Sequence, residues 1–148
     1  MVKPNNQIVL DSKNLHVQTK KVETATNVYP GRLVMKGTND DDIVVCDGTE
    51  GAAIGWAGYE QTAKNYRPAT VDTIYEADDQ ITVINGPGIL LVGRLASGQN
   101  VTKGARLMVA ANGELSGGTV GTNEIVAIAE ESVNATSGAA DIIVRSLI

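Results

Sequence analysis

The chain has 148 residues and a mass of 15.5 kDa, which favours one domain, or two very small subdomains, and argues against a second full-sized domain. Its net charge of −5, with no basic cluster longer than Lys20–Lys21, argues against a nucleic-acid partner. The single cysteine, Cys46, excludes an intrachain disulfide, and the lack of an 18-residue apolar run argues against a membrane-spanning helix. We expect synthesis and folding in a cytoplasm.

The composition predicts an all-β fold. The sequence contains 17 valines, 12 isoleucines and 13 threonines, but no phenylalanine. These β-branched side chains lose little freedom in a strand and pack well on a pleated surface.

Residues 1–27 predict an extended N-terminal arm. This segment is polar and lacks glycine, and its only apolar patch is Ile8–Leu10, followed by the isolated Leu15 and Val17. One interpretation is that the arm adds a strand to a neighbour's sheet through Ile8, Val9, Leu10, Leu15 and Val17. The other is that it packs back on its own domain as an edge strand. Under the first, a protein lacking residues 2–20 should fold but bind its partner weakly.

Residues 28–148 predict a β-rich domain. A turn at 29–31 precedes a hairpin over 33–46, whose tip is Asn39–Asp42, and Asn112–Gly113 is typical of a tight hairpin turn. Residues 60–70 are polar and predict a loop. Further strands are expected at 52–59, 71–75, 81–84, 89–92, 106–109, 125–129 and 142–145. Only 95–97 and 129–136 could form helical turns.

A weak internal repeat favours two related halves within this domain. The tetrad Arg32–Met35 recurs 74 positions later as Arg106–Val109, and Ala53–Gly55 recurs at the same offset as Ala127–Ala129. Chance recurrence in a chain rich in valine, isoleucine and alanine is the competing explanation.

The sequence lacks a recognisable catalytic constellation, so we expect no enzyme and no cofactor. The only histidine, His16, lies in the polar segment, and no Gly-x-Ser-x-Gly motif occurs. Neighbouring carboxylates such as Asp78–Asp79 point to opposite faces of a strand and form no dyad.

Two features leave binding roles open. The Asn39–Asp42 loop offers oxygen ligands for a hard cation but lacks the glycine and terminal glutamate of a calcium loop, and a solvated hairpin tip is the simpler interpretation, so we predict no metal site. Trp56 and Tyr59 could form a stacking platform, in which case the chain would be a small β-sandwich module that binds carbohydrate or a cell surface.

Several segments resemble the small decoration, or cement, proteins of tailed-virus (bacteriophage) heads. The resemblance spans about residues 28–148. It is carried by Tyr29–Val34, Ala53–Ala57, Val101–Val109, Asn112–Leu115, Ile125–Glu131 and Ala139–Arg145.

This resemblance implies a β-tulip or small barrel-like domain on the outer surface of an icosahedral capsid. It further implies a homotrimer that binds the major capsid protein and stabilises contacts between its subunits. Such a virion protein is made in the host cytoplasm and contacts neither nucleic acid nor membrane.

Overall fold

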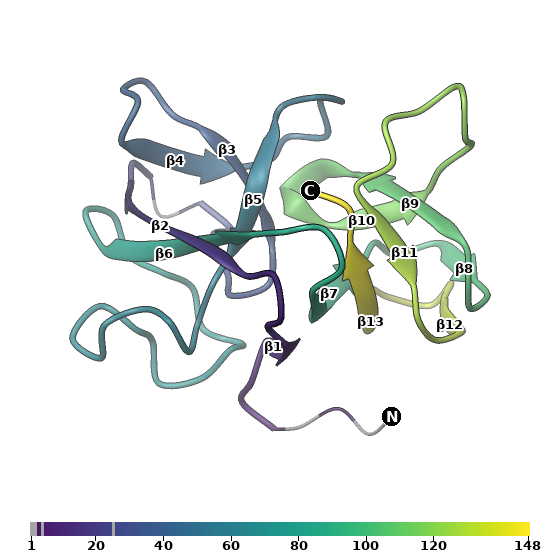
Figure 1. Cartoon of the computed structure of the whole chain (residues 1–148), viewed down its shortest axis with the longest axis horizontal. Helices are drawn as coiled ribbons and strands as arrows, with labels where there is room; N and C mark the ends of the chain where they lie inside the picture. Colours follow the sequence, from purple (N-terminus) through teal and green to yellow (C-terminus); the bar gives the residue numbers. More distant parts are fainter. Residues whose placement is uncertain (1–2, 4, 25) are drawn as a thin grey trace.

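The structure, a computed structural model, describes residues 3, 5–24 and 26–148 and confirms the all-β class. Its strands form two small closed barrels of five strands each, which lie side by side (Figure 1). The one helical element in the described residues is a 3₁₀ turn, η1 (Ala111–Gly113). The expected barrel-like architecture is therefore present twice.

The first barrel has the strand order β2-β4-β3-β5-β6. Its strands are β2 (His16–Val22), β3 (Leu33–Lys36), β4 (Asp42–Val45), β5 (Ala53–Ala57) and β6 (Gln80–Asn85). Small and β-branched side chains fill it together with one tyrosine, in a buried cluster of Val22, Val28, Val34, Ile43, Ala57, Tyr75, Ile81 and Val83. This cluster explains why the chain needs no phenylalanine here.

The second barrel is built from β7, β10, β9, β11 and β13 in that order. Their bounds are β7 (Leu90–Leu95), β9 (Arg106–Val109), β10 (Leu115–Gly117), β11 (Ala127–Ala129) and β13 (Ala140–Ser146). A short strand, β1 (Val9–Asp11), pairs antiparallel with β7 outside the barrel. The remaining strands, β8 (Gln99–Val101) and β12 (Val133–Ala135), form a separate antiparallel pair.

Both barrels have the same topology. β2 runs parallel to β4 and antiparallel to β6, and β7 has the same relations to β10 and β13. The β2–β6 and β7–β13 ladders each comprise six residue pairs. The segments that recur at an offset of 74 residues form β3 and β9, and then β5 and β11, which occupy corresponding places in the two barrels.

The barrels share an apolar joint. The Trp56 indole is fully buried and its Nε1–H donates a hydrogen bond to Ser146 Oγ at 3.1 Å. The backbone N–H of Gly113 donates to the Cys46 carbonyl at 2.8 Å, and that of Gly86 to the Ile148 carbonyl, also at 2.8 Å. One buried cluster accordingly includes side chains from both barrels, such as Leu33, Trp56, Leu91, Leu107 and Ile142.

Several predicted elements are present and others are absent. The 33–46 hairpin is confirmed by the β3–β4 ladder, and Asn112 and Gly113 have the expected positive φ angles of 59° and 66°. The prediction of a strand at 71–75 was wrong, because Tyr75 leaves the loop to fill the first barrel and donates its hydroxyl to the Gly58 carbonyl. The helical turns allowed at 95–97 and 129–136 are also absent: β7 ends at Leu95 and is followed by β8, and β12 lies within 129–136.

The N-terminal segment is tied to both barrels. β1 pairs with β7, while β2 supplies one wall of the first barrel through its ladder with β6. Deleting residues 2–20 would remove β1 and most of β2. We therefore now expect that such a protein does not fold, because a closed barrel that loses a strand exposes its core and two strand edges.

Candidate functional site

The segment expected to form an interface, Ile8–Val17, is divided by the structure. Ile8 and Val9 are buried in this chain's own core, with exposed fractions of 3% and 7%. The Val92 N–H donates to the Ile8 carbonyl at 2.9 Å, and the Glu60 carboxylate accepts hydrogen bonds from the backbone N–H groups of Ile8 and Val9. The backbone of these two residues is therefore already paired within this chain and is not available to a neighbouring protein.

The other three residues lie closer to solvent. Leu10 and Leu15 are half-buried, and Val17 is exposed at 54% on β2. The structure thus brings Ile8 and Val9 together on β7 and separates Val17 from them. Of the five, Val17 presents the most accessible apolar surface.

Residues 16–19 of β2 form an exposed strand edge. All four side chains, from His16 to Thr19, are exposed, although their backbone is held by the ladder with β6. On its other side β2 pairs with β4 only at Lys21 and Val22. Sequence patterning missed this edge because HVQTKKV has no apolar alternation to predict a barrel strand.

Lysines and aspartates border this edge. Lys13, His16, Lys20 and Lys21 all lie between Ser12 and Val22, a stretch without an acidic residue. Lys20 is bound by the β3–β4 hairpin, through the Asp40 carbonyl at 2.9 Å and the Asp41 carboxylate at 3.5 Å. Lys21 pairs with Asp42 and Asp78, and the carboxylates of Asp40 and Asp41 lie exposed beside the edge. Lys13 is therefore the one lysine of this stretch without an ion pair to a described residue.

Asp42 anchors the end of this edge. Its carboxylate accepts a hydrogen bond from the Asn39 side-chain amide at 2.6 Å and lies 3.4 Å from the Lys21 ammonium. The Asn39 hydrogen bond, opposed by partial desolvation and assisted by Lys21, lowers the pKa of Asp42. The carboxylate is thereby committed to the hairpin, and no group of three metal-ligating side chains occurs among the described residues.

A crevice of about 400 Å³ opens between the barrels. Arg32 lies in it, donating to Glu114 Oε1 at 3.1 Å and to the Asn112 carbonyl at 2.9 Å, with its guanidinium 5.1 Å from the Tyr29 ring centroid. Burial lowers the pKa of Arg32, and Glu114 partly offsets that effect. Across the crevice Arg94 pairs with Asp141 at 2.9 Å.

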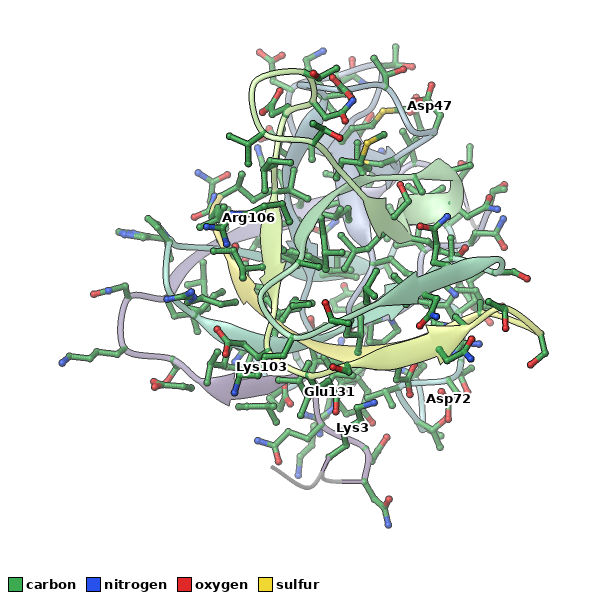
Figure 2. The ribbon with its side chains drawn as sticks, turned by 90° about the vertical axis from the view of Figure 1, so that its right-hand side faces the viewer. Lys3, Asp47, Asp72, Lys103, Arg106 and Glu131 are labelled. Carbon is green, nitrogen blue, oxygen red and sulfur yellow. The ribbon has the colours of Figure 1, made fainter. Side chains whose placement is uncertain are left out.

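The N-terminal segment closes one side of this crevice. Lys3 forms an ion pair with Glu131 at 2.8 Å and donates to the Asp141 carbonyl at 2.6 Å, and Figure 2 shows Lys3 and Glu131 next to one another. Since the arginines and this lysine all have partners within the chain, the crevice is best described as a polar joint.

Comparison with known proteins identifies the family. The sequence matches the phage family described as "Structural cement protein (E217 gp24/Pam3 gp6)" over residues 7–147, a range that includes both barrels. The chain belongs to this family of phage cement proteins. No curated protein sequence matches.

A solved structure shares the fold of this cement-family chain. The N base of the head fiber gp8.5 of bacteriophage phi29 superimposes with a TM-score of 0.54 over 89% of this chain and 93% of that one. The two sequences are 15% identical, so the likeness concerns the fold alone.

The stacking platform that a carbohydrate-binding module would need is absent at Trp56 and Tyr59. Trp56 is fully buried between the barrels, and Tyr59 is exposed at only 5%. The Tyr59 hydroxyl bonds to the Pro68 and Ala69 carbonyls, and Arg67 covers its ring at 4.9 Å from the centroid. Neither ring can stack on a sugar, so the structure corrects this prediction.

The cysteine and the histidine, the side chains most often found as nucleophile and base, lie apart in different environments. Cys46 is fully buried, and desolvation, aided by Asp47, raises the pKa of its thiol to about 12, so the nucleophilic thiolate is suppressed. His16 is exposed on β2, a surface position as expected, though on a strand. Within the described residues, no helix has the length and apolar character needed to span a bilayer.

Proposed function

We propose that this chain is a capsid decoration protein that binds the outside of an icosahedral phage head and stabilises contacts between major capsid subunits. The observation that carries the proposal is the family match, which runs through both barrels. The protein performs no reaction and requires no cofactor, nucleic acid or membrane. It is made in the host cytoplasm and acts as a homotrimer.

The architecture suits a mechanical role. Two barrels joined by a buried tryptophan and by backbone hydrogen bonds form a rigid body that can bridge neighbouring subunits without ordering itself on binding. If its binding site exists only where assembled subunits meet, the protein binds the assembled lattice and not the free subunits. Binding then stabilises the assembled lattice selectively. The net charge of −5 agrees with an exterior position, away from the packaged genome.

Sedimentation with phage heads tests this function. Purified protein would be mixed with empty expanded heads of the encoding phage, assembled without it, and the pelleted protein quantified against the capsid subunit. Saturation at a fixed ratio is expected, together with a higher temperature of head disruption. Absence of saturable binding at low and moderate salt would refute the proposal.

The oligomeric state is tested separately. Light scattering should give a mass three times that of the 15.5 kDa chain. A different mass would refute the trimer but would leave capsid binding open to the sedimentation test.

A further inference from the structure

The backbone of β2 has unused hydrogen-bonding groups. The Val22 N–H donates to the Asp79 carbonyl on the β6 side, at 2.9 Å, and the Lys21 N–H donates to the Asp41 carbonyl on the β4 side, at 2.8 Å. Because these directions alternate along a strand, the N–H and C=O groups of Val17 and Thr19 point to the β4 side. β4 begins only at Asp42, opposite Lys21, and no other described strand pairs with β2 there.

The second barrel shows what fills the corresponding place. Directly after β7, the Ala96 N–H donates to the Leu115 carbonyl of the parallel strand β10 at 2.8 Å. The Val92 N–H lies four residues earlier, within β7. Val17 lies four residues before Lys21 in the same way. The Val92 N–H is bound by the Ile8 carbonyl of the β1 segment at 2.9 Å, whereas the Val17 N–H faces an open edge.

We propose that residues 16–19 of β2 accept an extended segment of a capsid subunit, paired with this edge as β1 pairs with β7. This inference rests on the proposed function and names its docking site. Main-chain hydrogen bonds to Val17 and Thr19 supply affinity, and the exposed Val17 side chain covers an apolar residue of the partner. The site replaces Ile8–Leu10 as the point of strand addition, because the edge of β7 is already occupied.

Charge at Lys13 favours a capsid segment with an acidic residue opposite this lysine. Lys13 forms no ion pair with any described residue, whereas Lys20 and Lys21 are already paired with Asp41, Asp42 and Asp78. Such a segment would be attracted to Lys13, and its binding would weaken as salt rises.

Two variants test the edge against matched controls. Val17→Asp places a negative charge on the edge, and Val120→Asp makes the same change at another exposed valine, on the β10–β11 loop. Thr19→Pro removes an outward N–H and leaves the β6 ladder intact, whereas Gln18→Pro removes a ladder N–H and should unfold the barrel. The assays are thermal unfolding and sedimentation with the empty expanded heads described above.

The expected pattern is specific. Val17→Asp and Thr19→Pro should each weaken head binding about tenfold or more, while melting within a few degrees of wild type. Val120→Asp should bind within about twofold of wild type. If Thr19→Pro fails to fold, Val17→Asp decides the question.

The outcomes separate the two proposals. Wild-type occupancy by folded Val17→Asp and Thr19→Pro would overturn the edge site and leave the decoration function standing. Failure of the wild-type protein to bind heads would overturn the function, and the docking site with it. Self-association through this edge would be seen as a loss of mass by light scattering in Val17→Asp, and would overturn the capsid segment as the partner.

Discussion

The two barrels share a strand order but differ in how their corresponding strands β2 and β7 are covered. β7 pairs with β13, β10 and β1, and most of its side chains are buried. β2 pairs with β6 along its length and with β4 at one end, and its first four side chains are exposed. The same topology therefore has a covered strand, β7, in one barrel and a strand with an open edge, β2, in the other.

The interiors differ as well. The first barrel receives Tyr75 from its long β5–β6 connection, whereas the second shares its apolar cluster with the joint through Leu107, Leu115 and Ile142. Both halves thus close into a barrel, but the segments packed outside each barrel differ. These segments determine which strand edge stays open to a partner. The following predictions test how far the halves depend on each other.

The largest effect is expected from shortening the N-terminus. Removal of residues 2–20 takes β1 from the second barrel and most of β2 from the first, and should abolish cooperative unfolding. Removal of residues 2–11 takes only β1 and should leave a folded protein with a lower melting temperature, since Ile8 and Val9 leave the core. Urea unfolding followed by circular dichroism measures both, and a native-like transition without residues 2–20 would contradict the barrel role of β2.

Truncation at the joint should come next. Trp56→Ala should lower the free energy of unfolding by about 3–5 kcal/mol, because it empties a buried site between the barrels. Trp56→Phe retains much of the volume, loses the bond to Ser146 and should cost less. Calorimetry should show a single transition in wild type, and separate transitions in Trp56→Ala would indicate that this residue couples the halves.

Two glycines with similar backbone angles provide a smaller, matched test. Gly113 has φ of 66°, and an added Cβ would lie 2.4 Å from the Leu33 carbonyl oxygen. Gly104 has φ of 89° with no atom within 4 Å of such a Cβ. Gly104→Ala should cost about 1 kcal/mol from the backbone angle alone, and Gly113→Ala about 3 kcal/mol. Equal losses in chemical denaturation would show that the contact with the first barrel is unimportant.

The smallest effect concerns pH. Burial raises the pKa of Cys46 to about 12, so its contribution to stability is full below the ordinary thiol pKa of about 8.5 and is lost as pH rises toward 12. Tyr75, whose pKa is also raised to about 12, acts in the same direction above its usual range. Stability should therefore fall between about pH 9 and 10 with a slope that Cys46→Ala reduces. An unchanged slope would assign the effect to other groups.

Local features of the fold were predictable from sequence. The β-branched composition predicted the class, and Asn112–Gly113 predicted a turn because both residues tolerate positive φ. The Asn39–Asp42 tip followed from its acidic residues between two apolar runs. These features depend on neighbours in the chain, which the sequence displays directly.

Features that depend on contacts between distant parts of the chain were harder to predict from the sequence. β2 is polar, and its place in a barrel depends on pairing with β6, about 60 to 70 residues away in the chain. Trp56 lies beside glycine and alanine in a short strand, as an exposed platform might, but Ser146 from the other barrel covers it. The open edge at Val17 and Thr19 could not be predicted, because it is defined by where β4 begins in space.

The most direct test of the central claim is a cryo-electron microscopy reconstruction of empty expanded heads with and without the purified protein. The account predicts added density on the outer surface, fitted by the two-barrel body, that bridges neighbouring capsid subunits with residues 16–19 of β2 against an extended capsid segment. Identical maps, or density confined to the interior, would contradict it.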